Sequence, residues 1–505
     1  MATAVLSGGI ARGPITVSIM LATTMYAIDG TIANVALPHM QGGLSAGSDQ
    51  ITWVLTSFIV AQALATPLVG WVADRIGRKR LLLISIASFT TASAACGLAL
   101  NLEQMILFRV IQGLAGAAFV PLSQTILFDI NPPEKHAQAM SIFGAGVVLG
   151  PILGPFLGGW LTETLNWRWV FLVNLPVGVL AFLGVMTFLP EQRPTDQRAF
   201  DFMGFGSLAV FIVTLQLMFD RGPGEDWFQS LEIQLYAILA ASGLYMFIFH
   251  TLTAPKPFFD RTLLGNRNFL TGCLVGFLTG VLMFATLALL PPLMQNLLGY
   301  PVITAGVVTM PRGIGMFISM IVVGRAMSRF DPRALLAFGF IVNAVALWQM
   351  TLFNLEMDST LVIVSGVIQG FGLGFIFVPS NTLAFATLPA SMRTDGSAIF
   401  TLVRSNGSAV GISVMQALFV NNMQTSYSDL IQNIRPDNPN LPLATQGMEA
   451  LSAWAPEVAR QAAMVSYVSD FYLAMLLTLA ALPLVLLMKR PKTAPAAKET
   501  THVMD

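Results

Sequence analysis

Charge is scarce in this sequence. Only 10% of the 505 residues are Asp, Glu, Lys or Arg, against roughly 25% in an ordinary soluble domain. There are two cysteines and four histidines, and the acidic and basic residues are equal in number at 26. These shortages exclude a secreted disulfide scaffold, a disordered chain, a coiled coil and a nucleic-acid-binding protein. Cys96 and Cys273 lie in apolar runs and are predicted to be small buried hydrophobes. No pair of histidines has the spacing of a metal site.

Apolar residues make up 55% of the chain, and the mean hydropathy is +0.71. A spanning helix needs about 20 mainly apolar residues, and such runs recur along the whole length. The first run is long enough to span, and no signal-type cleavage site follows it. The predicted fold class is therefore an all-α polytopic membrane protein with 14 transmembrane helices. These helices are expected at 14–37, 50–73, 81–101, 104–128, 137–161, 169–189, 202–219, 232–251, 268–292, 302–324, 334–353, 361–387, 396–421 and 468–488.

Basic residues predict how the helices are oriented. Lys and Arg accumulate on the cytoplasmic side of membrane proteins. With the N-terminus inside, 19 of the 26 basic residues fall on the inside and 4 on the outside, and Arg109, Arg312 and Arg404 fall within helices. Both termini are therefore predicted to be cytoplasmic. The one long connection, 422–466, with a weak helical stretch around 448–462, is predicted to face outward.

The chain also repeats itself. "RVIQGLAGAAFVPLSQT" (109–125) matches "GVIQGFGLGFIFVPSNT" (366–382) at an offset of 257 to 258. Two homologous six-helix bundles bind substrate where the halves meet in many secondary transporters. The predicted organisation is a cytoplasmic segment (1–13), an N-terminal bundle (14–190), a linker with two extra helices (191–267), a C-terminal bundle (268–488) containing the outward loop 422–466, and a cytoplasmic tail (489–505).

Asp29 is the only acid that this helix map places well inside a span. A carboxylate at that depth costs about 2.5–3.5 kcal/mol on insertion scales, so it is by default a candidate functional group. Burial disfavours its charged form and a nearby cation favours it, so the two together allow proton exchange. The alternative is a structural ion pair that never titrates.

Arg109 is the predicted partner of Asp29. The first helix runs outward and the fourth runs inward, which places both residues in the outer half of the membrane. Neither group can stay charged there without a partner or water. The alternative for Arg109 is that its side chain reaches the outer interface.

The basic run "GWVADRIGRKR" (70–80) joins the second and third helices on the inside. Asp74 ends a helix, where the helix dipole disfavours an anion, so it is expected to need cationic neighbours. We interpret the segment as a latch that forms in one transport state and breaks in the other, built from Asp74, Arg75, Gly77, Arg78 and Lys79. The alternative is that its cations only fix the topology.

The fifth helix carries Gly146, Gly150, Gly154 and Gly158 on one face, and Pro151 and Pro155 bend it. Small-residue ladders let helices approach closely. The sequence predicts a tight, kinked contact between the two halves, with ordinary packing as the alternative.

Polar residues within other spans are candidates for the wall of a substrate cavity. Arg312 and Arg404 are candidates for attracting an acidic substrate group or pairing with Asp29, and Arg312 alternatively for binding carbonyls freed by Pro311. The remaining candidates are Asn34, Gln62, Gln112, Gln124, Gln369, Asn381 and Asn406. No phosphate-binding Gly-Lys-Ser/Thr loop, nucleophile elbow or zinc-protease motif is present. No metal, no cofactor and no enzymatic activity are therefore expected.

Several of these motifs resemble a known family. "GWVADRIGRKR" resembles the loop signature of the major facilitator superfamily, "FRVIQG" its fourth-helix motif, and "GPILGPFLGG" the fifth-helix motif of drug/proton antiporters. "IDGTIANVALP" resembles the 14-helix antiporter branch, and "DRGPGEDWF" and "LLGNRNF" resemble its EmrB-type exporters. The resemblance covers about residues 14 to 490.

The resemblance implies roles for individual residues. Asp29 and Arg109 would couple transport to protons. Asp129 would join Asp74, Arg75 and Arg78 in a cytoplasmic charge network. Gly150, Pro151, Gly154, Pro155, Gly158 and Gly159 would form the antiporter motif. Ser328 and Pro332 break the pattern in the second half, so a second latch is not expected. EmrB-type proteins also imply a periplasmic adaptor and an outer-membrane channel as partners.

The sequence therefore predicts a proton-coupled antiporter of the bacterial inner membrane that exports amphipathic drugs or toxic metabolites by alternating access, driven by the proton motive force. A proton symporter, or an exporter of one metabolite, is the alternative within transporters. A membrane receptor or scaffold without transport is the alternative of another class, although it would have no need to bury Asp29 and Arg109.

Overall fold

The structure is a computed structural model that describes residues 12–191, 199–432, 434 and 448–488. These residues form helices and no β-strands. Within the described residues, thirteen helices are long and apolar enough to cross a membrane, and a bent pair brings the number to 14. The predicted fold class and helix count are therefore confirmed.

The helices follow the apolar runs closely. Their bounds are α1 Arg12–Gly43, α2 Ser48–Ile51, α3 Trp53–Ala65, α4 Leu68–Ile76, α5 Arg78–Leu98, α6 Leu102–Gly116, α7 Phe119–Ile130, α8 His136–Thr164, α9 Trp169–Leu172, α10 Asn174–Phe188, α11 Phe202–Arg221, α12 Leu231–Thr253, α13 Arg261–Gly265, α14 Arg267–Pro292, the π-helical turn η4 Leu293–Leu297, α15 Val302–Ala326, α16 Pro332–Met350, α17 Ser359–Phe385, α18 Arg393–Ile431, α19 Met448–Ala480 and α20 Leu482–Leu487.

The second span is the bent pair. α3 and α4 meet at an angle of 59°. Pro67 lies at the break, where its ring removes a backbone donor and prevents a straight helix.

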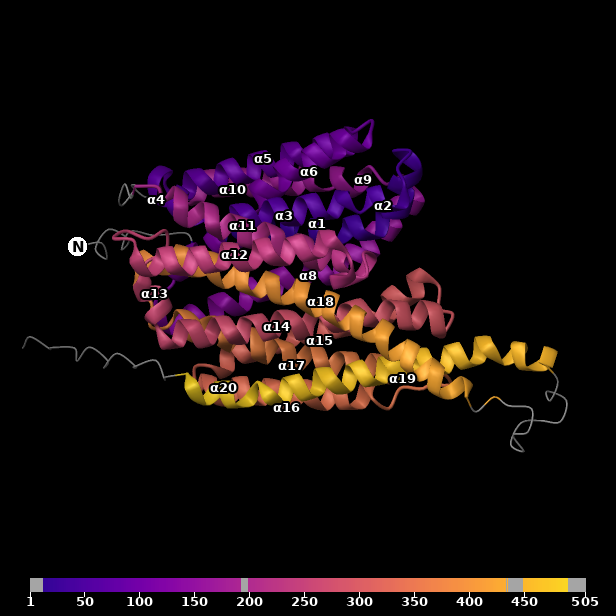
Figure 1. The fold of residues 1–505 in the computed structure, drawn as a ribbon. Coiled ribbons are helices and arrows are strands. Elements are labelled where there is room, and N and C mark those ends of the chain that lie inside the picture. The colour runs from indigo at the N-terminus through magenta and orange to yellow at the C-terminus, as the bar shows by residue number, and fades with distance from the viewer. Residues whose placement is uncertain (1–11, 192–198, 433, 435–447, 489–505) are drawn as a thin grey trace, which may run out of the picture.

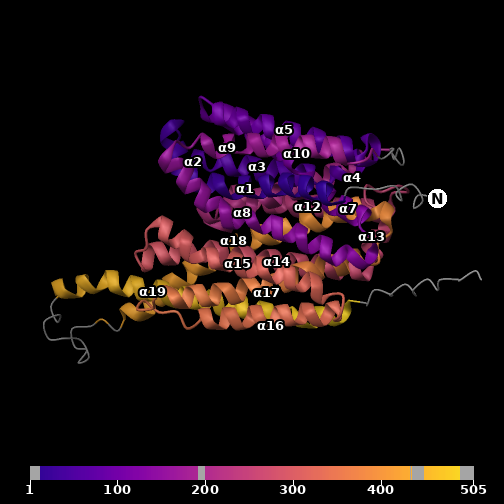
Figure 2. The same ribbon diagram turned by 180° about the vertical axis from the view of Figure 1, so that it is seen from behind.

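The helices form two bundles that lie side by side (Figure 1). α1 to α10 make one bundle, and α14 to α20 make the other. The start of α1 and the end of α20 lie at the same end of the molecule, which we call the terminal end; α2 and α9 lie at the opposite, far end. The view from behind shows the same arrangement (Figure 2).

The two extra helices lie along the seam between the bundles. α11 contacts both of them: Thr56 of α3 donates a hydrogen bond to Asp220, and Ser413 of α18 donates one to the carbonyl of Phe219. α12 packs on α11 at Gly243. The backbone of Phe211 lies so close to this glycine that a side chain would not fit there. The helix pair therefore covers one side of the seam.

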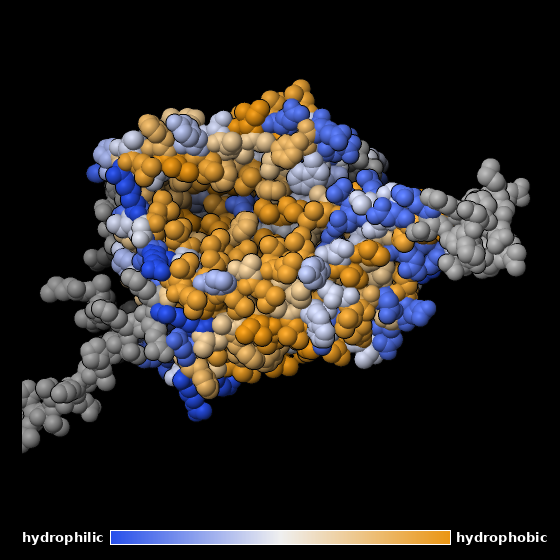
Figure 3. Space-filling view, turned by 60° about the horizontal axis from the view of Figure 1, so that its bottom comes forward, coloured by the Kyte–Doolittle hydropathy of each residue, from blue (hydrophilic) through white to orange (hydrophobic). Residues whose placement is uncertain are grey.

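The surface carries a broad apolar band with polar residues gathered toward its two ends (Figure 3). Residues such as Leu235, Ile238, Tyr245 and Phe249 on α12 are exposed. An apolar belt of this kind is what hydrocarbon contact requires.

The connection predicted at 422–466 is largely helical in the described residues. α18 continues to Ile431, and α19 begins at Met448 and runs unbroken to Ala480. The predicted helix start at 468 is therefore wrong, since it falls well inside α19. The apolar runs did not predict these helical segments because the segments are polar. A helix that extends beyond the membrane needs no apolar run. As a consequence, Asp470 lies within a span, and Asp29 is not the only acid there.

Candidate functional site

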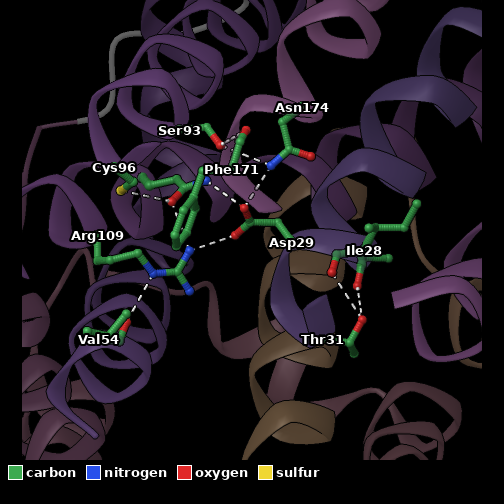
Figure 4. A network of polar contacts seen from close by, with 11 residues as sticks. Ile28, Asp29, Thr31, Val54, Ser93, Cys96, Arg109, Phe171 and Asn174 are labelled. Atoms are coloured by element: carbon green, nitrogen blue, oxygen red, sulfur yellow. Dashed lines mark hydrogen bonds and ion pairs between the residues drawn. The ribbon is translucent and has the colours of Figure 1, made fainter. Parts of the chain in front are cut away.

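Asp29 lies in the middle of a closed polar network (Figure 4). Its side chain is fully buried. Arg109 Nη1 donates to Oδ2 at 2.7 Å, while Gln112 Nε2 and Asn174 Nδ2 each donate to Oδ1 at 2.8 Å. Three donors, one of them a cation, thus bond to the two carboxyl oxygens of Asp29. Burial disfavours the charged form of a carboxylate, and donors of this kind favour it.

Arg109 is held as firmly as its partner. Its Nε donates to the carbonyl of Val54 at 3.0 Å, and its Nη1 donates to Gln112 Oε1 at 2.8 Å. The guanidinium lies over the ring of Phe58, 4.1 Å from the centroid. Arg109 is 1% exposed, so it does not extend to an interface as the alternative proposed. Removing one partner of a buried pair strands the other charge and costs about 3–5 kcal/mol.

An outer layer of polar groups supports the network. Asn174 Nδ2 also donates to Ser93 Oγ, and Ser93 donates to the carbonyl of Phe171. Cys96 Sγ lies 3.7 Å from Gln112 Oε1. Every group in the network comes from the N-terminal bundle, so the buried ion pair and its polar partners are contained in one half of the molecule.

The glycine ladder of α8 packs on α1, the helix that carries Asp29. A Cβ at Gly150 would collide with the backbone of Ala27, and one at Gly154 would collide with Thr31. Thr31 Oγ1 donates to the carbonyl of Gly150 at 2.9 Å. A Cβ at Gly158 would lie 2.9 Å from the carbonyl oxygen of Ile32. The prediction that this ladder joins the two halves is therefore wrong, because these glycines contact their own half.

Other residues of α8 contact the C-terminal bundle. Ser141 Oγ donates to the carbonyl of Met320 at 2.6 Å. Ile152 occupies the space beside Gly313 of α15. Gly159 has open space beside it. α8 therefore connects α1 to the seam through two different faces.

A pocket opens on the seam beside the two prolines. Pro151, Ile152 and Pro155 line one wall, and Met283, Thr309 and Arg312 line the other. Arg312 Nη2 donates to the carbonyl of Met283 at 2.9 Å. Arg312 thus binds a carbonyl of α14 and does not pair with Asp29.

The basic segment meets the C-terminal bundle at the terminal end. Arg78 pairs with Asp129, and Arg393 Nη1 of α18 lies 3.4 Å from the same carboxylate. Asp129 therefore links both halves. Gly70 has no room for a side chain because Asp395 of α18 packs against it.

The other latch residues lie around this junction. Asp74 is half-buried in the last turn of α4, and Gly77 has φ of 91°, a conformation that favours glycine. Arg75 lies over the ring of Trp71, and Lys79 Nζ donates to the carbonyl of Met186 at 2.8 Å.

Two of the cavity candidates, Gln124 and Asn381, bond to each other across the seam. Gln124 Nε2 donates to Asn381 Oδ1 at 3.1 Å, and Gln124 Oε1 accepts from Ser397. Gln62 donates to the Tyr26 hydroxyl. The guanidinium of Arg404 lies 5.1 Å from the centroid of the Phe377 ring. Nη1 of Arg404 is buried without a hydrogen-bond partner in the described part of the chain.

The remaining cavity candidates are dispersed. Gln112 belongs to the Asp29 network, and Gln369 is buried in the C-terminal bundle. Asn34 is exposed and Asn406 is half-buried.

The repeat shows what the second half lacks. At the offset of 257, Asp29 corresponds to Thr286 and Gln112 to Gln369, and Gln369 Nε2 donates to Thr286 Oγ1 at 2.9 Å. Arg109 corresponds to Gly366. The same helix contact therefore persists in the C-terminal bundle without its two charges.

Sequence reasoning missed four contributors to these sites: Asn174, Ser93, Arg393 and Ser397. Asn174 carried a signal, as a lone amide in the apolar run "VFLVNLPVG". Arg393 and Ser397 carried none, because their partners, Asp129 and Gln124, belong to the other half of the chain.

The sequence matches the family model described as Major Facilitator Superfamily over residues 19–412. The multidrug export protein EmrB of Escherichia coli K12 is 34% identical over 486 residues, which is 94% of this chain and 95% of that protein. EmrB of Haemophilus influenzae is 35% identical over 84% of each chain. The fatty acid resistance protein FarB of Neisseria gonorrhoeae is 32% identical over 96% of this chain and 97% of that protein.

Solved structures share the fold at low identity. The human organic anion transporter MFSD10 superposes with a TM-score of 0.59 at 15% identity, covering 93% of this chain and 99% of that one. The proton:xylose symporter XylE gives 0.61 at 13% identity, covering 92% of this chain and 94% of that one.

Proposed function

The chain belongs to the major facilitator superfamily, and from that premise we propose that it is a proton-coupled antiporter that exports amphipathic drugs or toxic metabolites across the bacterial inner membrane. The main support for proton coupling is that Asp29 is a fully buried carboxylate with three hydrogen-bond donors, all from one half of the molecule. The names of its relatives, EmrB above all, support export of drugs.

The network supplies a mechanism. Protonation of Asp29 neutralises the only anion bonded to Arg109 among the described residues. Arg109 then holds an uncompensated charge, which is costly away from water. It must reach solvent or a new partner, and the helices α1 and α6 must move for that. Proton binding is thereby coupled to rocking of the N-terminal bundle.

The proton gradient supplies enough energy for this task. One proton moving inward through about 100 mV yields about 2.3 kcal/mol. A pH difference of one unit adds about 1.4 kcal/mol. Together they support an outward gradient of a few hundredfold for a neutral substrate, so no cofactor or ATP is needed.

The terminal end is cytoplasmic in this proposal, because the basic residues of the connections gather there. The contacts of Asp129 with Arg78 and Arg393 then close the cytoplasmic gate. A Ser428→Cys variant tests the orientation, because Ser428 is exposed near the end of α18. A membrane-impermeant thiol reagent should label it from outside intact cells, and labelling only in everted vesicles would contradict the map.

The resemblance to EmrB-type exporters also leads us to propose two partner proteins. A periplasmic adaptor and an outer-membrane channel would receive substrate, and the ends of α18 and α19 at the far end offer a docking surface.

Arg312 and Arg404 are proposed to attract acidic groups of substrates in the seam.

Everted membrane vesicles test the direction of transport. An imposed pH gradient, acid inside, should collapse on addition of ethidium if the protein exchanges protons for substrate. Empty-vector vesicles provide the control. An unchanged gradient would favour the symporter, the single-metabolite exporter or the scaffold. Transport of compounds from a resistance screen then separates these three alternatives. Movement of a compound together with protons indicates the symporter, movement against protons indicates the single-metabolite exporter, and no proton-coupled movement indicates the scaffold.

A further inference from the structure

One acid is buried far from the ends of the helices in the half of the molecule that lacks a counterpart of Asp29. Asp470 of α19 is fully buried. Asn422 Nδ2 of α18 donates to its Oδ1 at 3.3 Å, while Oδ2 is buried and has no hydrogen-bond partner in the described part of the chain. A carboxylate with one weak neutral donor is poorly compensated, in contrast to Asp29.

No cation faces Asp470 within the described residues. Arg460 on the same helix lies almost three turns away, about 15 Å along the axis, and it is bonded to Glu457 and the carbonyl of Leu297. On α18, Arg404 precedes Asn422 by about five turns. Asp429, which is itself an acid, follows Asn422 by about two turns.

The described parts of the other elements that lie beside Asp470 add no positive charge. Tyr467 lies one turn away, with its ring 4.3 Å from that of Phe419. Phe471 contacts Phe353, and the nearby connection carries two exposed acids, Glu356 and Asp358. The spanning parts of α14 (268–292) and α16 (334–350), together with η4 and α20, contain no charged residue. The charged form of Asp470 therefore lacks the stabilisation that burial demands.

Asp470 lies close to the depth of the coupling network. At the rise of a regular helix, Asp29 is about 26 Å from Arg12 at the terminal end, and Asp470 is about 26 Å from Leu487 at the same end. When 300 is added to the residue numbers of α10, its buried residues fall at positions that are also buried in the segment of α19 and α20. Asp470 therefore lies about one turn farther toward the far end than the level of Asn174, a direct partner of Asp29.

We propose that Asp470 is a second proton-binding group, neutral in this conformation, which releases its proton when α18 and α19 admit water. Release breaks the carboxyl O–H bond of Asp470 and passes the proton to a water molecule, which becomes hydronium; uptake from hydronium at the far end reverses this transfer, and no electrons move. This inference rests on the proposed proton-coupled transport. It adds a proton site in the C-terminal half, separate from Asp29.

Infrared titration of the purified full-length protein in detergent is the direct test. The wild type should show the carbonyl band of a protonated, weakly bonded carboxyl at neutral pH, and the band should disappear on titration to alkaline pH. Asp470→Asn should remove the band, Asp470→Glu should shift it, and Asp29→Asn should leave it unchanged. A spectrum that is identical in the wild type and Asp470→Asn would overturn the proposal, and so would a band that resists alkaline titration.

Proteoliposomes loaded with ethidium give an independent measure. The membrane potential at which ethidium flux reverses reports the number of protons exchanged, and Asp470→Asn should exchange one fewer than the wild type. An equal number would refute a role for Asp470 in exchange. Absence of any proton-dependent ethidium flux in the wild type would instead refute the proposed function, while the infrared titration would still decide whether Asp470 binds a proton.

Discussion

At the scale of single residues, burial depth predicted the pair of Asp29 and Arg109, because two opposite charges at one level of a bundle have few other partners. The sequence did not predict that Gln112 and Asn174 complete the site. A glutamine within a span suits a cavity wall and a buried network equally well, and only the packing of α1, α6 and α10 decides between them.

Loss of Arg109 should destabilise the protein. Arg109→Ala leaves the buried carboxylate of Asp29 without its cation and with only the neutral donors Gln112 and Asn174, so we expect a loss of about 3–5 kcal/mol, measured as thermal or denaturant unfolding in detergent. Arg80→Ala is the matched control, because its pair with Glu191 is exposed and such pairs contribute about 0–1 kcal/mol. Equal effects of the two substitutions would show that the buried pair has no special role.

Neutralising both charges should restore part of that stability. The variant Asp29→Asn with Arg109→Gln removes the stranded charge while keeping hydrogen-bonding groups at both positions. We expect it to unfold at a higher temperature than Arg109→Ala and to lack proton-driven ethidium efflux. Proton-driven efflux in the double variant would contradict the assignment of coupling to this pair.

At the scale of elements, helix positions follow from apolar runs, since each span must fill the hydrocarbon thickness. The partner of a helix face is not written in its own sequence. The glycines of α8 predicted a close contact, and the contact exists, but it is with α1 and not with the other half. The unbroken extension of α19 was equally invisible, because its first turns are polar.

Substitution on the ladder of α8 should separate α8 from α1. Gly150→Ala places a methyl group against the backbone of Ala27, which cannot rotate away, and overpacking of this kind costs about 1–3 kcal/mol. We expect lower thermal stability and reduced ethidium efflux at equal expression. Gly159→Ala, farther along the same helix in open space, should match the wild type. Equal behaviour of the two variants would contradict the packing role.

At the scale of the whole molecule, two bundles meet at the terminal end through a few polar contacts. Repeats of the sequence predicted the two bundles, because homologous segments fold alike. They did not predict the junction, since Asp129, Arg393, Gln124 and Ser397 have no local pattern that pairs them.

Weakening this junction should open the terminal end. Ser397→Cys is a reporter, because Ser397 is 1% exposed while the halves are in contact. Asp129→Asn removes two ion pairs, and a loss of about 1 kcal/mol raises the open population about fivefold. Labelling of the introduced thiol by a soluble reagent should accelerate accordingly. Glu191→Gln, which breaks an exposed pair within one half, should leave the rate unchanged, and equal rates in all three proteins would contradict the gate.

The most direct test of coupling at Asp29 compares two modes of transport in one variant. In proteoliposomes, Asp29→Asn should retain exchange of labelled for unlabelled ethidium, which needs no net proton movement, and should lose accumulation driven by an imposed pH gradient. Full gradient-driven accumulation by Asp29→Asn would contradict the account, because protons would then be coupled to transport without this carboxylate.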